Sequence, residues 1–521
     1  MPNNRPVRLL QDTLQRSVEL FPDKIAIVSG PDRITFAELW ERCVAMAHAL
    51  RRIGVNRGDR VAIFLDNTWH CPVALYGTLL ADAVFVIINP QTKSDKLSYI
   101  LKDCSASALI ADQHLRSVFV PSIADSQVKG VIVAGQGAAT PAEPRLLGWD
   151  EVLSECAGME AKTRSITVDL CSLIYTSGST GEPKGVMHTH QSMVFALQSL
   201  VEYLRLDETD CLLCVLPLAF DYGMYQLLMA MSTGATLVLE RSFTYPAQVF
   251  KSMQAEGVTV FPGVPTIFAM LLAAHERQPL EFPSVKRVTN TAAALPSSFN
   301  TRLREIFPKA DLYRMYGLTE CKRVSYLPPS EVDRKPDSVG IAIPGTEVMV
   351  LDDAGQPVAP GRVGKLYVRG AHVMLGYWNQ PEKSAHMLKP GRFPGERVLC
   401  THDLFTVDED GYLYFVGRSD DIIKCRGEKV SPIEVEAVLF GIGGIREAAV
   451  IGVPHPVLGQ AVHAYVNLAD GSKLDEHDVK RICGEKLEAY MVPQRVVFLP
   501  ELPKSANGKI DKKALASAHV G

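Results

Sequence analysis

The 521-residue sequence predicts an α/β protein with a large N-terminal domain of layered α/β subdomains, a small β-barrel-like subdomain and a small α+β C-terminal domain. Three observations lead to this prediction. From about residue 7 to about residue 320, apolar strand-like runs alternate with helical segments, which is typical of α/β layers. After residue 320, short strands and turns dominate. Beyond a charged segment at 417–421 lies a unit of about a hundred residues, enough for a small domain.

The predicted elements follow in this order along the chain. A helix opens at Phe36 and runs to about Arg51, and buried strands are expected at 60–65, 83–88, 109–111 and 131–133. Strands at 347–351 and 364–368 belong to the β-rich part, and strands at 448–453 and 461–466 belong to the last unit. We place the domain boundary between residues 417 and 418, which gives domains 1–417 and 418–521.

Composition excludes several classes of protein. The net charge is −4, the hydrophobic share is 47% and the charged share is 21%, as in ordinary globular proteins. We see no basic run that would suggest nucleic-acid or membrane binding. The N-terminus lacks the apolar core of a signal peptide, and no stretch has the roughly 18 apolar residues of a membrane helix. Eleven dispersed cysteines suggest reduced thiols. We therefore expect a cytoplasmic protein with no nucleic-acid or membrane partner.

A loop suited to polyphosphate is the most informative feature. The sequence YTSGSTGEPKGV at 175–186 follows an apolar run and contains three glycines, several hydroxyls and the cation Lys184. Glycine lets the backbone approach an anion, and backbone N–H groups and hydroxyls can then donate to phosphate oxygens. It is not a Walker A loop, because no Ser or Thr follows the lysine. The expected nucleotide-binding residues are Thr176, Ser177, Gly178, Ser179, Thr180 and Gly181.

This string resembles the phosphate loop of the adenylate-forming superfamily, which includes acyl-CoA synthetases, adenylation domains of nonribosomal peptide synthesis and luciferases. Four further motifs follow in the order and approximate spacing of that family: YGLTE at 316–320, THDL at 401–404, GRSDDIIKCRGEK at 417–429 and PKSANGKID at 503–511. The resemblance extends from about residue 10 to about residue 515. It implies a ligase that uses ATP and Mg²⁺.

The resemblance also implies roles for individual residues of the nucleotide site. Tyr316 would stack on adenine, Thr319 would contact phosphate and Glu320 would bind the metal, in line with the affinity of carboxylates for magnesium. Asp403 would accept the ribose hydroxyls. His402 stands where the family usually has glycine, and we interpret it as a residue that tolerates a turn.

The last two motifs imply a mobile C-terminal lid. Arg418 would bind the ribose, and Asp420 would be the hinge about which the domain rotates between two catalytic poses. Lys509 matches the catalytic lysine of the family, whose ammonium would bridge the attacking carboxylate and the α-phosphate. Together with Thr319, Glu320 and Lys184, it completes the expected catalytic set.

The predicted activity is that of an AMP-forming ligase that makes a carbon–sulfur bond. An acid attacks the α-phosphate of ATP, pyrophosphate leaves, and a phosphopantetheine thiol of a carrier protein or of CoA displaces AMP. Two alternatives belong to other classes: a non-catalytic relative that only binds nucleotide, and a luciferase-like oxidase of the adenylate. The presence of the complete catalytic set disfavours the first, and no feature favours the second.

The acid pocket is the weakest part of the prediction. Phe220-Asp221 matches the Phe-Asp pattern of amino-acid-activating domains, in which the carboxylate pairs with the substrate ammonium. With Tyr222, Tyr225 and Ala293, it suggests a modest pocket for a small amino acid such as proline, loaded on a separate carrier protein. The argument fails if Asp221 is exposed or meets a side-chain cation. The same pattern also resembles stand-alone ligases from polysaccharide-export gene clusters, so a fatty or aryl acid with CoA remains the alternative.

Overall fold

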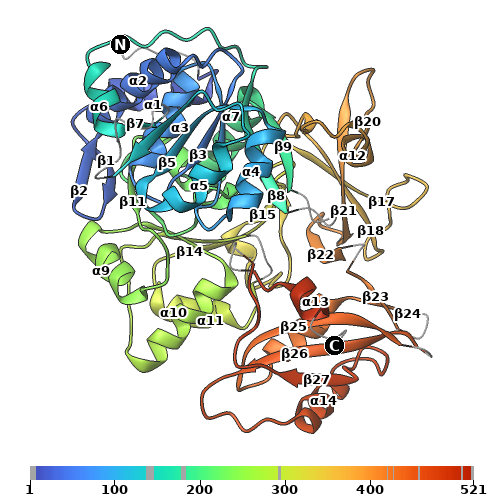
Figure 1. The fold of residues 1–521 in the computed structure, drawn as a ribbon. Helices are drawn as coiled ribbons and strands as arrows, with labels where there is room; N and C mark the ends of the chain where they lie inside the picture. The colour runs from blue at the N-terminus through green and yellow to red at the C-terminus, as the bar shows by residue number, and fades with distance from the viewer. Residues whose placement is uncertain are drawn as a thin grey trace.

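The computed structural model describes residues 7–135, 146–177, 183–291, 295–418, 421–425, 428–455, 458–505 and 509–517, except the side chains of residues 177 and 429. In Figure 1, the chain forms a large upper body and a smaller unit below it, coloured orange to red, which contains the residues after about 420. The mixed α/β architecture with a large N-terminal and a small C-terminal part is the predicted fold class.

The first sheet of the large body has the strand order β19-β9-β8-β4-β3-β5-β6-β7. Pairing is parallel from β8 to β7 through the middle of the sheet, and it becomes antiparallel between β8 and β9. The strands are β3 (Arg60–Phe64), β4 (Val84–Ile87), β5 (Ala106–Asp112), β6 (Gly130–Ala134), β7 (Leu146–Gly148), β8 (Leu170–Ser177), β9 (Pro183–Thr189) and β19 (Gly376–Tyr377).

The second sheet has the order β16-β15-β14-β13-β12-β10-β11-β1-β2. Its central strands, from β14 to β1, are parallel, so their carboxyl ends meet at one edge. The strands are β1 (Ile25–Ser29), β2 (Asp32–Thr35), β10 (Cys211–Cys214), β11 (Thr236–Leu239), β12 (Val260–Gly263), β13 (Arg287–Asn290), β14 (Asp311–Tyr316), β15 (Ser325–Leu327) and β16 (Ile341–Ala342). In such sheets ligands bind beyond the carboxyl ends of the strands.

Helices cover both faces of the first sheet, as the alternation along β3 shows. Val61 and Ile63 belong to the large core that also contains the second sheet, whereas Ala62 and Phe64 belong to a core on the opposite face. The large core contains residues of α1 (Leu10–Leu20), α2 (Phe36–Ile53), α3 (His70–Leu80), α6 (Trp149–Glu155), α7 (His190–Leu204) and α8 (Asp221–Thr233). The opposite face packs against α4 (Ser94–Asp103) and α5 (Arg116–Ile123), and the second sheet is flanked by α9 (Pro246–Glu256), α10 (Pro265–Arg277) and α11 (Phe299–Ile306).

The helix predicted at 36–51 is α2, and its ends show why the sequence forms it. The Thr35 side chain accepts a hydrogen bond from the amide of Glu38, and the Glu38 carboxylate accepts one from the amide of Thr35, which is a capping box. At the other end, Gly54 adopts the left-handed conformation with φ of 95°. Glycine is favoured there because it carries no Cβ.

The β-rich part predicted after residue 320 is an antiparallel sheet with the order β17-β18-β21-β20, and β22 pairs with β21. Its strands are β17 (Glu347–Leu351), β18 (Gly364–Arg369), β20 (Leu388–Pro390), β21 (Arg397–Val407) and β22 (Leu413–Arg418), and α12 (Pro381–Met387) lies beside it. Its core includes Val186 of β9 and Val324 near β15. This small sheet therefore packs against elements of both larger sheets.

The C-terminal unit has its own sheet, with the order β24-β23-β26-β25 and β27 pairing with β26. Its elements are β23 (Ile423–Cys425), β24 (Glu428–Val430), α13 (Pro432–Phe440), β25 (Ile445–His455), β26 (Gly459–Leu468), α14 (Glu476–Gly484), β27 (Arg495–Phe498) and α15 (Lys512–Ser517). The change of sheet occurs between Arg418 and Ile423, within the segment expected to separate the domains. The boundary between residues 417 and 418 itself stays a prediction.

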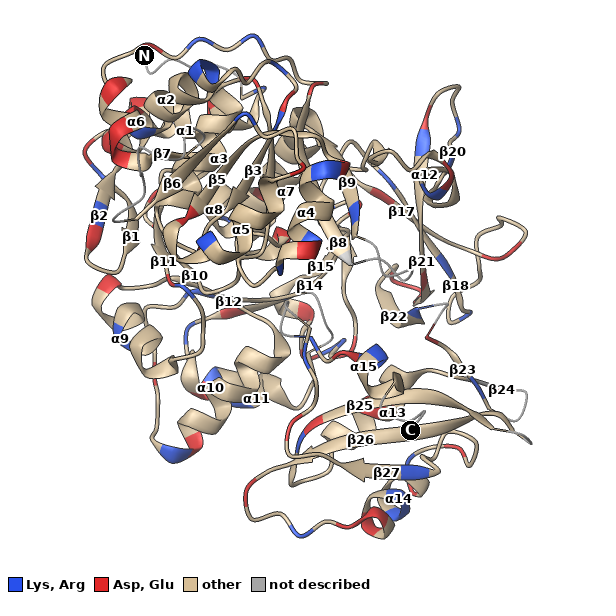
Figure 2. Cartoon of the chain, in the orientation of Figure 1, with Lys and Arg blue, Asp and Glu red and all other residues tan. Residues whose placement is uncertain are grey.

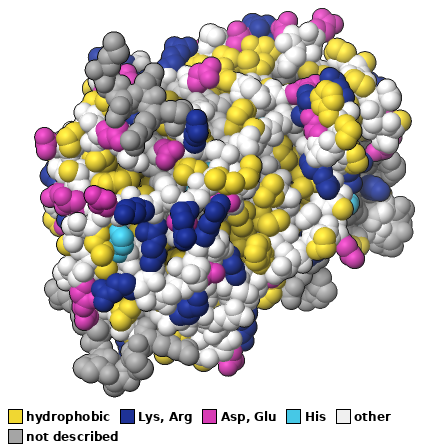
Figure 3. All heavy atoms as spheres, turned by 90° about the horizontal axis from the view of Figure 1, so that it is seen from above, with side chains coloured by type: hydrophobic (Ala, Val, Ile, Leu, Met, Phe, Trp, Pro, Cys, Tyr) yellow, Lys and Arg dark blue, Asp and Glu magenta, His cyan; other side chains and the backbone are white. Residues whose placement is uncertain are grey.

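The surface and the thiols agree with the composition. Acidic and basic residues are spread over the elements of both units (Figure 2), and both signs are interspersed with hydrophobic side chains on the face drawn in Figure 3. All eleven cysteines are buried and unpaired, and Cys211 and Cys214 are the two ends of core strand β10. Within the described ranges, no helix combines the length and apolar character needed to cross a membrane.

Gly340 connects the second sheet to the small sheet, and it provides a test of this packing. It pairs with Leu413, its φ is 87°, and a Cβ added to it would lie 1.8 Å from the carbonyl oxygen of Tyr326. Gly355 has a similar φ of 77° but open space around the same position. Left-handed backbone costs an alanine about 1–2 kcal/mol at either site, and overpacking adds roughly 1–3 kcal/mol at the first.

We therefore expect Gly340→Ala to lower the melting temperature of the large body clearly more than Gly355→Ala does. Calorimetric unfolding of the two variants beside the wild type measures the difference. Equal melting temperatures for the two variants would show that the contact between Gly340 and Tyr326 does not constrain the fold.

Candidate active site

The predicted phosphate loop is the connection between β8 and β9. Thr176 pairs with Lys184 in the ladder, so both lie where the two strands enter this connection. Gly178, Ser179, Thr180 and Gly181 lie outside the described residues, and only the backbone of Ser177 is described. Their role in nucleotide binding stays a prediction. The strands on either side of the loop belong to the first sheet.

Close packing at the start of β9 explains Gly185. A Cβ on this residue would lie 3.1 Å from the ring of Tyr175 and 3.3 Å from Cβ of Trp378. The Trp378 indole donates to the carbonyl of Asp103 over 2.9 Å, and the Tyr175 hydroxyl donates to the carboxylate of the same residue. Two aromatic side chains thus fix the strand that carries Lys184.

Lys184 is connected to Glu320 through Tyr377 of β19. The Lys184 ammonium lies 5.4 Å from the centre of the Tyr377 ring, and the Tyr377 hydroxyl donates to Oε1 of Glu320 over 2.7 Å. Burial lowers the pKa of Lys184, and Lys383 shifts it in the same direction. A cavity of about 230 Å³ adjoins this group and is lined by Lys184, Tyr377, Glu382, Lys383, His386 and Met387.

The turn after β14 places Thr319 and Glu320 at the carboxyl edge of the second sheet. A Cβ on Gly317 would lie 2.3 Å from the carbonyl oxygen of Lys322, so this turn requires glycine. His188 is fully buried, and its Nε2 donates to the carbonyl of Thr319 over 2.8 Å. Burial holds the pKa of His188 well below its ordinary value, so the imidazole is a neutral donor. His188 therefore fixes the backbone of the motif.

Asp403 joins two of the predicted nucleotide-binding residues. Its Oδ2 accepts a hydrogen bond of 2.5 Å from the Tyr316 hydroxyl, and its Oδ1 lies 3.2 Å from Nε of Arg418. Asp403 and Arg418 are also partners in the β21–β22 ladder. Burial raises the pKa of Asp403, and Arg418 opposes that shift. The preceding residue, His402, has a φ of 59° and lies within β21, where the register of the β18–β21 ladder shifts. It is therefore a left-handed residue at a strand irregularity, and its interpretation as a turn residue is wrong.

Lys509 reaches the same place from the C-terminal unit. It is accessible to solvent, and it interacts electrostatically with Arg418 and Asp403. Reduced hydration among protein atoms lowers the pKa of Lys509, Arg418 lowers it further and Asp403 raises it. Ion pairs of 2.7 Å between Lys504 and Glu447 and of 2.6 Å between Lys512 and Glu436 hold the chain on either side of it.

Two further predicted residues, besides those of the phosphate loop, lie outside the part of the chain that the structure describes. Asp420, the expected hinge, and Ala293, expected in the acid pocket, both lie outside the described residues. Their roles stay predictions.

Asp221 meets a side-chain cation, which is the condition under which the argument for an amino-acid substrate fails. Its Oδ1 lies 2.7 Å from Nζ of Lys322, whose side chain is fully buried, while that of Asp221 is 10% exposed. The carboxylate at the start of α8 is therefore neutralised inside the protein. This removes the physical argument that it requires a substrate ammonium, and the expectation of an amino-acid pocket that rested on Asp221 is withdrawn.

The two predicted pocket tyrosines are core residues of α8. The Tyr222 hydroxyl lies 2.7 Å from the carbonyl and 2.8 Å from the hydroxyl of Thr289, and the residue is 6% exposed. Tyr225 is fully buried and donates to the carbonyl of Met193 over 3.3 Å. Both hydroxyls are thus used to fix α8 against its neighbours.

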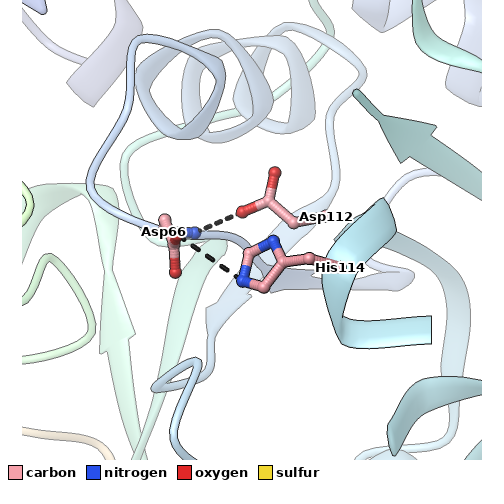
Figure 4. Close-up of side chains that lie close together, drawn as sticks. All are labelled: Asp66, Asp112 and His114. Carbon is pink, nitrogen blue, oxygen red and sulfur yellow. Dashed lines mark hydrogen bonds and ion pairs between the residues drawn. The ribbon is translucent and has the colours of Figure 1, made fainter. Parts of the chain in front are cut away.

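A second polar cluster lies apart from this site, at the ends of β3 and β5. Oδ2 of Asp112 accepts from the amide of Asp66 over 2.7 Å, and Nε2 of His114 lies 3.6 Å from Oδ2 of Asp66 (Figure 4). Arg241 lies 3.6 Å from the same carboxylate oxygen. Because Arg241 already supplies a positive charge, we assign no metal ion to this cluster.

Four residues around the site were not singled out from the sequence: His188, Tyr377, Lys322 and Arg323. Lys322 and Arg323 directly follow the YGLTEC segment. Their positive charges next to this motif were the signal that could have identified them. His188 and Tyr377 lie about 130 and 60 residues from the motif that they contact, and only the fold brings them there.

Comparison with known proteins agrees with this geometry. Residues 14–378 match the family described as AMP-binding enzyme, and residues 434–509 match the AMP-binding enzyme C-terminal domain. A long-chain-fatty-acid–CoA ligase of Bacillus subtilis (strain 168) is 30% identical over 98% of this chain and 94% of its own. A feruloyl-CoA synthase of Amycolatopsis sp is 33% identical over 95% of this chain and 96% of its own.

Solved structures give the same result. The structure of an anthranilate CoA ligase in complex with anthranoyl-AMP has a TM-score of 0.90 and 28% identity, and covers 99% of this chain and 98% of its own. A benzoate CoA ligase from Burkholderia xenovorans LB400 has a TM-score of 0.87 and 28% identity, and covers 98% and 99%. The chain therefore belongs to the AMP-binding enzyme family of the adenylate-forming superfamily, and it is an ATP-dependent, AMP-forming ligase that makes carbon–sulfur bonds.

Proposed function

We propose that the protein is a CoA ligase for a fatty or aryl acid. The observation that carries this proposal is the ion pair between Lys322 and Asp221, which removes the signal for an amino-acid substrate. The similarity to CoA ligases over nearly the whole chain supports the same substrate class and the same thiol acceptor. The expected loading of proline on a carrier protein has no support from these relatives.

The residues present fit ATP and a magnesium ion. The β8–β9 connection and Lys184 would bind the β- and γ-phosphates, and Asp403 and Arg418 would bind the ribose hydroxyls. Oε1 of Glu320 accepts from Tyr377, and within the described part of the chain Oε2 has no assigned partner, so this oxygen is available to an ion. Glu320 would hold the magnesium ion, which would supply positive charge to neutralise the phosphates.

In the first step, a carboxylate oxygen of the acid attacks the α-phosphorus, and the bond to pyrophosphate breaks. Lys509 would place its ammonium between the two anionic reactants, and Thr319 would donate to phosphate. Such reactions depend on positioning and charge neutralisation more than on covalent chemistry by the protein. The electrostatic interaction of Lys509 with Asp403 and Arg418 supports this assignment.

In the second step, the CoA sulfur attacks the acyl carbon, a thioester forms and AMP leaves. Lys509 must withdraw so that the thiol can enter, and we propose that the C-terminal unit rotates about Asp420. The segment between β22 and β23 joins the two units, and few residues separate the strands there. A rotation therefore requires only a small number of backbone angles to change.

The direct test is AMP and pyrophosphate formation with fatty, aryl and amino acids side by side, each with CoA or with a carrier protein bearing phosphopantetheine. We expect product with a fatty or aryl acid and CoA, and none with amino acids. Turnover with amino acids and a carrier protein alone would contradict the proposal. Binding of ATP without turnover of any acid would indicate a non-catalytic relative.

Lys509→Ala should abolish adenylate formation and spare thioester formation from a supplied acyl-adenylate, because Lys509 serves only the first step. Single-turnover measurements of the two half-reactions separate these effects. Lys509→Arg is the matched control, since it retains a positive charge, and it should keep more of the first step than the alanine variant. Equal loss of both half-reactions in Lys509→Ala would exclude the assigned role.

Asp221→Asn should destabilise the large body by about 3–5 kcal/mol, because it leaves the Lys322 ammonium buried without its partner. Replacing Lys322 by methionine in the same chain should restore much of this loss. Melting temperatures of the wild type, the single variant and the double variant form the test. A single variant as stable as the wild type, with a selective loss of amino-acid activation, would instead support an ammonium-binding Asp221.

A further inference from the structure

Two buried cations follow the Thr319–Glu320 motif, and among the described residues only one of them has an anionic partner. Lys322 is 1% exposed and pairs with Asp221, as described above. Arg323 is 4% exposed, and among the described residues no carboxylate lies within ion-pair distance of it. Buried arginines are nearly always paired, because moving an uncompensated charge out of water is costly.

The contacts of Arg323 satisfy only part of its guanidinium. One Nη donates to the carbonyl of Lys322 over 2.9 Å, and the guanidinium carbon lies 5.2 Å from the centre of the Tyr222 ring. Its Nε is buried and, within the described ranges, has no hydrogen-bond partner. A carbonyl and an aromatic face are weak substitutes for a carboxylate, which can bind a guanidinium through two parallel hydrogen bonds.

Arg323 lies near the carboxyl ends of the parallel strands of the second sheet. The Tyr222 side chain that it contacts is fixed by Thr289, near the end of strand β13. Gly263 and Tyr316 end the neighbouring parallel strands β12 and β14. These carboxyl ends form the edge at which an α/β sheet binds its ligands. Thr291, just beyond β13, is 2% exposed, and its hydroxyl also lacks a partner among the described residues. Two buried polar groups without a partner among the described residues, those of Arg323 and Thr291, thus lie near the same edge of the sheet.

We propose that Arg323 determines substrate specificity by binding a second carboxylate of the acid, so that the preferred substrate is a dicarboxylic acid. The inference rests on the proposed function and names the substrate class of the same site. One carboxylate of the diacid enters the reaction with ATP, and the other pairs with the guanidinium of Arg323. The Asp221 carboxylate does not compete for this cation, since Lys322 already neutralises it.

The test compares acids of equal chain length with one or two carboxylates, such as octanoate with octanedioate and cinnamate with 4-carboxycinnamate. ATP–pyrophosphate exchange gives kcat/KM for each acid. We expect the wild type to favour the diacid of at least one pair. Arg323→Gln and Arg323→Met should lower kcat/KM for that diacid by on the order of 100-fold, which is typical for removing one partner of a buried charge pair. The monoacid and the KM for ATP should change little.

Arg314→Gln is the matched control. Arg314 is also buried, at 6% exposed, and its Nε likewise lacks a partner among the described residues. Unlike Arg323, it donates from both Nη atoms, to Oδ1 of Asn300 over 3.0 Å and to the carbonyl of Pro336, so we assign it a structural role. This variant should lower the melting temperature and leave the ratio of diacid to monoacid activity unchanged. A loss of stability in the Arg323 variants without any change in that ratio would assign Arg323 a structural role and overturn the proposal.

Thermal shift in the presence of ATP gives a second measurement that does not require turnover. The diacid should raise the melting temperature of the wild type more than the monoacid does, and Arg323→Gln should remove the difference. Equal shifts, or no shift by the diacid, would overturn the assignment of Arg323. Selective thermal stabilisation by the diacid with no pyrophosphate exchange for any acid would support Arg323 as a binding residue and contradict the proposed ligase activity.

Discussion

The carboxylate of Asp403 is the constraint on which the arrangement of the site depends. One of its oxygens accepts from Tyr316, at the end of a strand in the second sheet, and the other contacts Arg418, where the small sheet ends and the chain leaves for the C-terminal unit. Lys509 of that unit interacts with the same pair. A buried carboxylate must be compensated. Its partners come from the second sheet, the small sheet and the C-terminal unit. The contacts that compensate this charge therefore also hold these parts of the fold together.

A second group connects the first sheet to the motif at 316–320. Lys184 faces the ring of Tyr377, Tyr377 donates to Glu320, and His188 donates to the carbonyl of Thr319. The groups assigned to phosphate and to metal are thus positioned by β9 and β19 of the same sheet. The site assigned to nucleotide lies where elements of all three sheets of the large body meet, which explains why its residues are spread over about 330 positions of the chain, from Thr176 to Lys509.

The buried cations next to this site show how charge pairing inside a protein changes the meaning of a motif. Asp221 alone suggests a positively charged substrate, whereas Asp221 with Lys322 is a closed ion pair. Lys322 adopts a φ of 65°, an uncommon conformation for a residue with a side chain, in the turn that encloses Gly317. The same turn places Arg323 beside Tyr222. The backbone geometry after the YGLTE motif therefore decides that Lys322 pairs with Asp221 and that Arg323 is left for a ligand.

The sequence by itself determined the fold class, the order of the main elements and the family. Local patterns sufficed for these: the capping box at Thr35 and Glu38, the apolar runs that became β3, β4, β25 and β26, and five motifs that each occupy a short segment. Only the tertiary structure decided the partners of Asp221, Asp403 and Glu320, because those contacts join residues that are 101, 87 and 57 positions apart. The acid pocket was misjudged for the same reason: whether a buried charge requires a ligand depends on neighbours that folding supplies.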